Sequence, residues 1–403
     1  MRRGISTLLL LLALFMAPAA GETIDVCPAG CAQVSVQAAI DAASPHDTVF
    51  VHEGTYTEHL NIGKPLTLKG EGVRTVILSY RGGTDLFVNG SGVEVESIAF
   101  SGEGYGIYAV AVDSLHIRNC TFMNQSSGVQ LRGVSNGQLE GNSFFGIRGA
   151  AIWLEQSQSA TIRGSYFEGC SEGIGASHSA DLFVEGNTFR RCQSGIAAGD
   201  SPRARIGANL FESCEHGIVL RNSLDSRIFG DMFNHTVQPI SLLDSPAAII
   251  DTQETSLPIQ LMRSGGSMLT LGRWRIGCGD CRVEPTTIGA PEGARMMGNA
   301  LSMTTPEVAG EVLVSAQVLP GELEGLDLET VGIHVIENGS SILIPQDLQR
   351  GENLTFTASF GNSGRKHVLA ILGRPKWEFP VLLGAILVIA VVAAAILLIR
   401  RRG

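Results

Sequence analysis

The clearest pattern along this chain is a phenylalanine that returns at nearly constant spacing. Seven of them follow one another at steps of 22 or 23 residues: Phe100, Phe122, Phe144, Phe167, Phe189, Phe211 and Phe233. An aliphatic residue stands five positions before each, and a glycine stands six positions after five of them. A fixed period of about 20–50 residues is typical of repeat proteins, whose units bury apolar surface by stacking on their neighbours. The pattern therefore predicts a repeating fold.

Each repeat contains two or three short β-branched runs separated by Gly, Asn and Ser turns. Runs this short do not make helices, and the repeats lack hairpin turn signals. The chain should therefore wind into coils whose strands pair in parallel with the coil before. We expect an all-β solenoid with about 22 residues per coil over residues 22–250.

Polar residues recur at the corners of the predicted coils. One corner, just before the phenylalanine, carries Gly-Asn or a similar pair, and a second carries a serine with a polar residue before it. A further column alternates in charge from coil to coil: Glu96, Arg118, Glu140, Arg163 and Glu185. Such residues suit turns and cross-strand pairs, so they should fix the register of the coils.

The segment before the repeats carries a second recognisable pattern. Residues 36–49, 54–58 and 64–68, together with the repeats, resemble the right-handed parallel β-helix proteins that share the pectin lyase fold and include periplasmic proteins of the NosD type. The resemblance covers about residues 24–250 and implies a right-handed β-helix, in a family of enzymes and non-enzymes. From the residues themselves, Ser35 can cap a short amphipathic helix that covers the open edge of the first coil.

The N-terminal end of the chain predicts export. Arg2 and Arg3 precede an apolar run from Leu8 to Met16, and small residues follow at Ala17 to Ala20. The run is too short to span a bilayer, so residues 1–20 are predicted to be a signal peptide.

The C-terminal end predicts an anchor. Phe379 to Ile399 carries no charge and is long enough to cross a bilayer, and three arginines follow directly in the tail 400–403. The positive-inside rule places that tail in the cytoplasm. We expect a single-pass protein of the cell membrane with the bulk of the chain outside the cell.

The residues before the apolar run add a second resemblance. Trp377-Glu378-Phe379-Pro380, the run and the arginines are similar to the tail of archaeal cell-surface proteins, some of which are cut and re-anchored. Trp377 stands where such motifs carry proline. We favour a helix that is retained, with processing as the alternative.

Charge and sequons agree with an extracellular surface. The net charge of −10 disfavours binding to nucleic acid. Six Asn-X-Ser/Thr triplets are candidates for glycosylation: Asn89, Asn119, Asn124, Asn234, Asn338 and Asn353.

The cysteines fall into separate groups. Cys27 with Cys31 and Cys278 with Cys281 are candidates for local disulfides, with half a zinc site or redox chemistry as the alternative. Three more follow successive phenylalanines by three residues and should stack: Cys170, Cys192 and Cys214. Buried packing is favoured over a metal strip for this stack, and nothing assigns a role to Cys120. We predict no metal site and no cofactor.

The repeat dissolves beyond about residue 250. Residues 251–300 form a connecting segment, and residues 301–375 carry five short strand candidates: Glu311–Ala316, Val331–Ile336, Ser341–Ile344, Leu354–Ala358 and Val368–Leu372. Their spacing suggests an antiparallel β-sandwich that acts as a stalk.

The repeats offer one candidate ligand face. Glu155, His178, Asp200, Asn222 and Asp244 are expected to form a column beside the serine corner. A histidine between carboxylates can do acid–base chemistry, but Asp and Asn at corners more often make turns, and turn chemistry is favoured.

Exposed aromatic platforms for sugar are few. The candidates are Tyr105, Tyr108, Trp153 and Tyr166, and Trp153 is expected in the core because it aligns with Leu131 and Leu220.

Because nearly every polar residue has equivalents one coil away, the pattern favours a scaffold that is not an enzyme. The predicted role is envelope structure, adhesion or glycan binding, with a surface polysaccharide or envelope protein as partner. The alternative is a lyase, epimerase or hydrolase acting on uronate-containing glycans. A role in metal delivery is disfavoured, since Met and His ladders are absent from the sequence.

Overall fold

The computed structural model describes residues 21–78 and 82–252 and, with short gaps, residues 258–375. The chain divides into two compact units, Met1–Ala248 and Ile249–Gly403. The predicted signal peptide, residues 1–20, and the predicted membrane helix, residues 379–399, lie outside the described residues. Within the described residues, no helix is both long enough and apolar enough to cross a bilayer.

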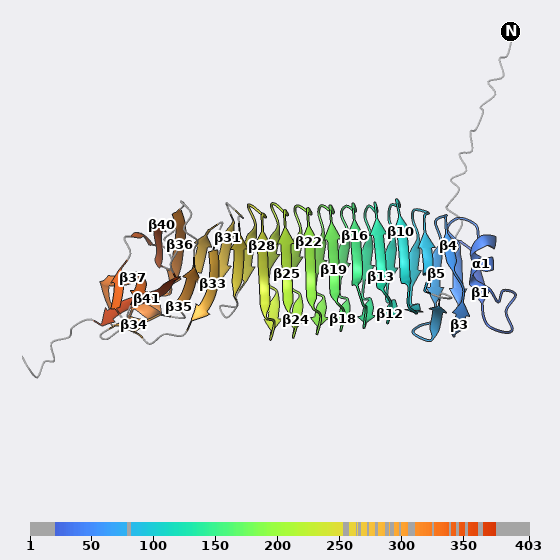
Figure 1. Cartoon of the computed structure of the whole chain (residues 1–403), viewed down its shortest axis with the longest axis horizontal. Helices are drawn as coiled ribbons and strands as arrows, with labels where there is room; N and C mark the ends of the chain where they lie inside the picture. The colour runs from blue at the N-terminus through green and yellow to red at the C-terminus, as the bar shows by residue number, and fades with distance from the viewer. Residues whose placement is uncertain are drawn as a thin grey trace, which may run out of the picture. The chain divides into compact units, whose positions relative to one another are not determined.

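The first unit is a solenoid in which each coil adds one strand to each of three parallel sheets (Figure 1). Sheet A takes, in order, β1 (Thr23–Val26), β2 (Thr48–Val51), β5 (Thr67–Gly70), β8 (Glu94–Glu96), β11 (His116–Arg118), β14 (Gln138–Glu140), β17 (Thr161–Arg163), β20 (Phe183–Glu185), β23 (Arg205–Gly207) and β26 (Arg227–Phe229). Sheet B takes β3 (Gly54–Thr57), β6 (Thr75–Leu78), β9 (Ala99–Ser101), β12 (Thr121–Met123), β15 (Ser143–Phe145), β18 (Tyr166–Glu168), β21 (Thr188–Arg190), β24 (Leu210–Glu212) and β27 (Met232–Asn234). Sheet C takes β4 (Leu60–Ile62), β7 (Thr84–Val88), β10 (Tyr105–Val110), β13 (Ser127–Arg132), β16 (Ala150–Glu155), β19 (Glu172–Ser177), β22 (Ser194–Gly199), β25 (His216–Arg221) and β28 (Gln238–Leu243). The parallel all-β solenoid predicted from the repeat is confirmed.

The phenylalanine ladder runs through the core behind sheet B. Consecutive rings from Phe100 to Phe233 stack with centroids 4.6–5.2 Å apart and planes 3–12° from parallel. All seven rings are buried. The glycine column exists because of these rings: a Cβ atom added at Gly173 would lie 2.6 Å from the ring of Phe189.

Two polar ladders close the corners. At the corner between sheets A and B, the backbone N–H of each ladder residue donates to the side chain of its counterpart in the next coil. Asn187 N–H, for example, donates to Asn209 Oδ1 at 3.0 Å. At the corner after sheet C, Ser179 N–H donates to Ser201 Oγ at 3.1 Å, and neighbouring serines repeat the bond. Backbone donors that the turns would otherwise leave buried and unpaired are thereby satisfied, so these ladders hold register as well as shape.

The alternating charge column lies on sheet A as expected. Arg118 stands between Glu96 and Glu140 in the parallel register, and its Nη2 lies 3.3 Å from Glu96 Oε2. Arg163 Nε lies 3.7 Å from Glu140 Oε1. These pairs are exposed, so each stabilises the coil by only a few tenths of a kcal/mol, about 0.2–1.

The helix α1 (Val36–Ala42) covers the first coil. Ser35 caps it by accepting a hydrogen bond from Ala38 N–H, and Val36, Ala39 and Ile40 face inward. Glu58 completes the cap from a neighbouring coil, because its carboxylate accepts the amides of Val36 and Gln37 at 2.9 and 3.0 Å. The helix start therefore has its free N–H groups satisfied.

The second unit is also made of strands, but most of them pair antiparallel. One set runs β29 (Ile249–Thr252), β31 (Met268–Leu271), β32 (Trp274–Gly277), β36 (Glu311–Val318), β40 (Leu354–Gly361) and β39 (Gln346–Arg350), with only β29 and β31 parallel. The other runs β38 (Ser340–Leu343), β37 (Leu326–Glu337), β41 (Lys366–Pro375), β35 (Ala300–Thr304), β33 (Cys281–Thr286) and β30 (Ile259–Met262), with β34 (Arg295–Met296) on β41. A 3₁₀ turn, η1 (Pro320–Leu323), leads into β37.

The five predicted strand runs of this unit fall on strands, apart from Ile344, which lies outside the described residues, but the predicted sandwich is not supported. Strands attributed to the connecting segment 251–300 pair with those of the supposed stalk, as β32 does with β36 and β33 with β35. The pairing therefore does not isolate a separate domain over residues 301–375. Turn signals locate strands, but they do not say which strands become neighbours.

The stacked rings lead to a first prediction. Phe189→Ala should lower the free energy of unfolding by about 3–5 kcal/mol, because the ring is fully buried between two others. Phe145→Ala is the matched control, since this phenylalanine lies on the same sheet but is 36% exposed. Urea unfolding of the purified protein followed by circular dichroism measures both. Equal losses for the two variants would show that the ladder is not what holds the coils.

The last member of the asparagine ladder gives a second prediction. Asp231 is buried, accepts the backbone and side-chain N–H groups of Asn209 through Oδ1 at 2.8 Å each, and has no partner for Oδ2 among the described residues. Burial raises the pKa of this carboxyl from its ordinary 3.8 to about 7. The folded state therefore binds a proton that the unfolded state has released, and stability should fall as the pH rises from about 4 to about 7.

Asp231→Asn should remove that part of the pH dependence, worth about 2–4 kcal/mol. Asp225→Asn, at an exposed corner residue, is the control. Unfolding curves at about pH 4 and pH 8 measure the difference. An unchanged pH dependence in the Asp231 variant would contradict the assignment.

Candidate functional site

The predicted ligand column is a row of turn residues, and one of its members was misassigned. His178, Asp200, Asn222 and Asp244 do follow one another at the serine corner, each with φ between 49° and 53°. Glu155 is not among them: it pairs in register with Ser177 at the end of sheet C, and Gln156 takes the corner position.

The contacts of this column are those of an exposed corner. His178 Nε2 lies 3.9 Å from Asp200 Oδ2, and Asn222 Nδ2 donates to Asp200 Oδ1 at 3.1 Å. The side chains of His178 and Asp200 are 64% and 48% exposed. Asp and Asn tolerate the left-handed conformation that the corner requires, so the geometry agrees with turn chemistry.

The cysteines follow the predicted grouping. Cys27 is bonded to Cys31 and Cys278 to Cys281, while Cys120, Cys170, Cys192 and Cys214 are free and buried. The thiols of the stack donate to core carbonyls, as Cys192 does to Phe167 O at 3.8 Å. Burial raises the pKa of Cys120 to about 12, so that thiol is protonated and unreactive at neutral pH.

Four of the six candidate glycosylation sites lie on described residues. Asn89, Asn119, Asn124 and Asn234 are all exposed. Asn338 and Asn353 fall outside the described residues.

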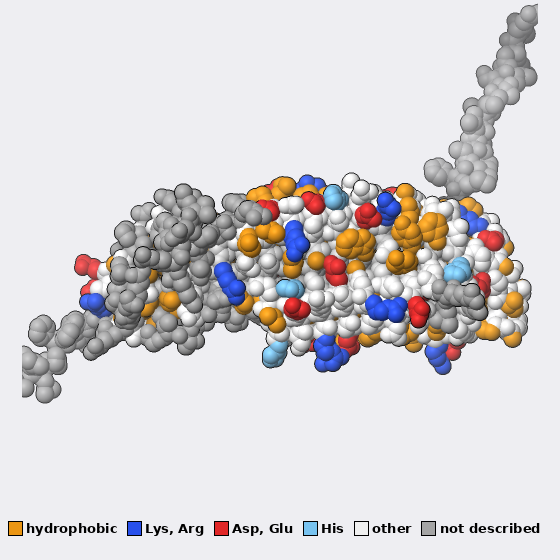
Figure 2. Space-filling view, in the orientation of Figure 1, with side chains coloured by type: hydrophobic (Ala, Val, Ile, Leu, Met, Phe, Trp, Pro, Cys, Tyr) orange, Lys and Arg blue, Asp and Glu red, His pale blue; other side chains and the backbone are white. Residues whose placement is uncertain are grey.

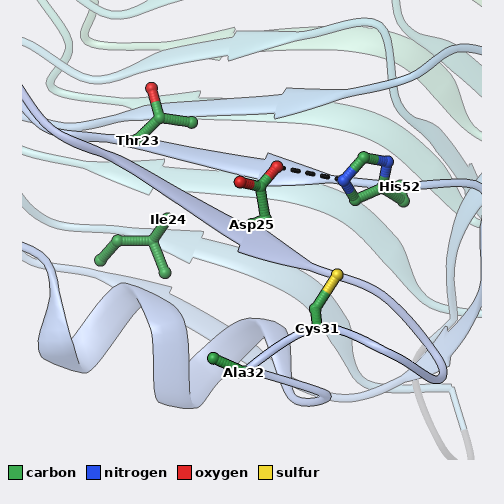
Figure 3. A pocket seen from close by; sticks show the side chains of 6 residues that line it. All are labelled: Thr23, Ile24, Asp25, Cys31, Ala32 and His52. Carbon is green, nitrogen blue, oxygen red and sulfur yellow. Dashed lines mark hydrogen bonds and ion pairs between the residues drawn. The ribbon is translucent and has the colours of Figure 1, made fainter.

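An open pocket lies beside the first coil and is lined by Thr23, Ile24, Asp25, Cys31, Ala32 and His52 (Figure 3). Asp25 and His52 point toward one another, with His52 Nε2 3.0 Å from Asp25 Oδ1. The other ring nitrogen lies 3.4 Å from Glu71 Oε2, and Glu71 also accepts the amide of Glu53, which lowers the pKa of its carboxyl. The cluster ties together three successive coils. Across the described part of the chain, no three His, Cys, Asp or Glu side chains are placed to hold a metal ion.

The outer face of sheet C carries a row of aromatic side chains. In register along the outward column stand Phe87, Tyr108, Gln130, Trp153, Gly175 and Ala197. Phe87 and Tyr108 have ring centroids 5.8 Å apart, and Tyr105 lies 6.5 Å from Tyr108 and is 39% exposed. Figure 2 shows hydrophobic side chains gathered on this face over β10 and β16. We call Phe87, Tyr105, Tyr108 and Trp153 the aromatic row.

Trp153 therefore points outward, which corrects the prediction that it belongs to the core. Leu154, not Trp153, is paired with Leu131 on the inner side. The cause is one extra residue before β16, because the step from Phe144 to Phe167 is 23 residues where its neighbours are 22. The same insertion displaced Glu155 in the alignment. The sequence signal was present: this repeat carries Ala150 where other repeats have the glycine.

The indole of Trp153 packs over a glycine of the next coil, Gly175. A Cβ atom added at Gly175 would overlap Cε3 of Trp153 and would lie 2.8 Å from Glu172 Oε1. The indole and the Glu172 carboxyl thus crowd the same point above Gly175. Gly175 itself is buried beneath them, although it lies on the outer side of the sheet.

Glu172 is a half-buried carboxyl without a cation. It begins β19, and burial, the single cause, raises the pKa of its carboxyl. No hydrogen bond or ion pair of its side chain is found among the described residues. Several other carboxylates of the solenoid have an arginine in reach, such as Glu155 with Arg132 at 3.7 Å and Glu168 with Arg191.

Two further polar groups follow Glu172 in its column. Ser194 and His216 are the next residues in parallel register. Ser194 Oγ and His216 Nδ1 are buried and have no hydrogen-bond partner within the described coordinates. The outer face of sheet C thus combines an aromatic row with a short column of polar side chains, and this is the candidate site.

The chain resembles known proteins in its solenoid region. The family model described as "Right handed beta helix region" matches residues 105–252. Among curated proteins, "SHC SH2 domain-binding protein 1" of Homo sapiens is 27% identical over 143 residues, which is 34% of this chain and 21% of that protein. The match therefore spans about a fifth of the length of that relative.

Several solved structures share the fold. A DFA-IIIase from Arthrobacter chlorophenolicus A6, without its lid and in complex with GF2, is 13% identical with a TM-score of 0.50, covering 61% of this chain and 93% of that one. An alginate lyase from Paenibacillus sp. str. FPU-7 is 16% identical with a TM-score of 0.43, covering 55% and 97%. A Family 28 exopolygalacturonase from Yersinia enterocolitica is 10% identical with a TM-score of 0.45, covering 58% and 66%.

The DFA-IIIase structure contradicts the prediction that the protein is not an enzyme. It is named as an enzyme and has the same fold, so the regularity of the repeat is no argument against catalysis. At these identities the likeness shows the fold alone. Together with the three parallel sheets, the family match shows that this chain contains a right-handed β-helix region, matched over residues 105–252.

Proposed function

We propose that this protein binds an extended glycan across the outer face of sheet C. The observation that carries the proposal is the aromatic row, which leaves Tyr105, Tyr108 and Trp153 at least partly exposed on the outer face of a regular sheet. Aromatic rings offer sugars a large apolar face and little conformational freedom to lose.

The spacing of the row supports a polymer rather than a single sugar. Tyr108 and Trp153 are two coils apart, and neighbouring strands are separated by about 4.8 Å, so the two rings are about 10 Å apart along the solenoid. A chain of sugars lying along the solenoid could meet both rings. Gln130 stands between them and can hydrogen-bond hydroxyl groups.

The same site supports a second candidate function, modification of a uronate-containing glycan by a lyase, epimerase or hydrolase. The observation in its favour is Glu172, whose raised pKa and aromatic neighbour are properties of acid catalysts. An enzyme would need a second group to accept a proton or activate water, and His216 is two coils away in the same column.

The setting we propose is the cell surface. An exported chain that retains residues 379–399 as a membrane helix would hold the β-helix outside the membrane. The exposed Asn89, Asn119, Asn124 and Asn234 would then be open to glycosylation. Detection of the intact chain on whole cells by an antibody to the β-helix tests this placement.

The aromatic row gives a third prediction. Trp153→Ala should weaken glycan binding about tenfold, because one stacking contact contributes on the order of 1 kcal/mol. His178→Ala on the exposed corner should leave the affinity unchanged. A glycan array identifies ligands, and titration calorimetry measures the two variants. Loss of binding in His178→Ala but not in Trp153→Ala would place the ligand on the corner instead.

A parallel assay separates binding from catalysis. Uronate polymers are incubated with the protein, with and without calcium, and the formation of unsaturated or shortened products is followed. Turnover that disappears in Glu172→Gln would favour the enzymatic candidate, whereas binding without turnover would favour the binding module.

The packing of the Trp153 indole over Gly175 gives a fourth prediction. Gly175→Leu should displace Trp153 from its place, shift its fluorescence emission and weaken glycan binding. Ala197→Leu is the matched control, because Ala197 occupies the same column one coil on, beyond the tryptophan. If both variants bind as the unchanged protein does, the position of the Trp153 ring has no part in recognition.

A further inference from the structure

We propose that Glu172 and Trp153 form a binding site for an ammonium group, so that the glycan recognised on sheet C carries free amino sugars. This inference rests on the proposed glycan-binding function and names the class of sugar. It rests on the packing above Gly175, where Oε1 of Glu172 and the indole ring of Trp153 lie close to the same point.

The carboxyl group of Glu172 provides the negative charge of the proposed site. Glu172 is partly withdrawn from water, yet no cation pairs with it among the described residues, and burial is the sole influence on its pKa. A carboxylate held in this way is destabilised, because it has lost water without gaining a partner. A ligand cation would restore the missing charge pair, and that gain is available only to a cationic ligand.

The indole of Trp153 provides the aromatic face of the proposed site. The face of a tryptophan attracts an ammonium group through the quadrupole of the ring, more strongly than tyrosine or phenylalanine does. A carboxylate beside an aromatic face is therefore selective for a positively charged amine over a neutral hydroxyl. The sugar that carries the amine would also stack its apolar side on the same ring.

The surrounding charges do not already supply a cation to Glu172. Arg132 on β13 is engaged by Glu155, and Arg221 belongs to the last column of sheet C rather than to the column of Glu172. His216 on β25 has Glu215 Oε1 at 3.8 Å from its Nε2. A uronate at this position would instead bring a second carboxylate to an unpaired first one, which costs energy.

The test compares three oligosaccharides of equal length: one of glucosamine with free amino groups, its N-acetylated form, and a galacturonate oligomer. Binding is measured by calorimetry at about pH 6, where amines are protonated. The unchanged protein should bind the amino form about tenfold or more tightly than the N-acetylated form, and the galacturonate most weakly. Glu172→Gln should lower the affinity for the amino form to about that for the N-acetylated form.

Two controls make the outcome specific. Glu155→Gln removes the same charge from an exposed carboxylate of the same sheet, so it reports the general attraction of a cationic polymer to an acidic protein, and it should keep the preference. Trp153→Ala should weaken both the amino and the N-acetylated forms. Thermal unfolding of Glu172→Gln should show equal or higher stability, because the variant removes an unpaired charge.

The results also separate this inference from the proposed function. If the N-acetylated form binds and Trp153→Ala weakens that binding, glycan binding on sheet C is supported, with or without a preference for the amino form. A preference for the amine that survives Glu172→Gln, or tighter binding of galacturonate than of glucosamine, overturns the ammonium site. If none of the three oligosaccharides binds, the ammonium site is overturned, and a glycan array that also finds no ligand would remove the proposed function with it.

Discussion

Every coil of the β-helix repeats the backbone of the coil before it at the spacing of neighbouring strands, so a side chain meets its own counterpart above and below. The phenylalanines use this by stacking ring on ring, and the corner serines and asparagines use it by passing each backbone N–H to the next coil's side chain. Register is therefore fixed from the inside and from the corners together. A slip of one residue would remove the rings from the core and leave the corner amides unpaired.

This internal constraint leaves the outer face of each sheet free to vary. On sheet A the outward residues alternate in charge, and on sheet C they include aromatic residues up to Trp153. The change from large to small residues after Trp153 occurs just beyond the one repeat that is a residue longer than those around it. The regular interior thus carries the fold, and the local irregularity carries the candidate site.

Much of the interior could be predicted from the sequence, because ladders of identical residues are visible at a fixed period. The phenylalanine column, the inward aliphatic residues and the polar corners all lie where the repeat indicates. The two errors within the repeats share one origin: the extra residue before β16 shifted Trp153 and Glu155 by one position, and a shift of one residue in a strand reverses the face. Glu172 could not be recognised from its type, since its significance lies in lacking a cation. Equally, a regular repeat could not decide whether the protein is an enzyme, because the same fold is found in a structure named as an enzyme.

The central claim is that ligand binding belongs to the outer face of sheet C at the site of the irregular repeat. Hydrogen–deuterium exchange of the protein with and without a bound glycan tests it most directly, because it reports protection along the whole chain. We predict slower exchange in the peptides that cover β10, β13, β16 and β19, with no change at the corner residues Asp200 and Asn222. Protection at that corner, or around the pocket of Asp25 and His52, with none over Trp153 and Glu172, would contradict it.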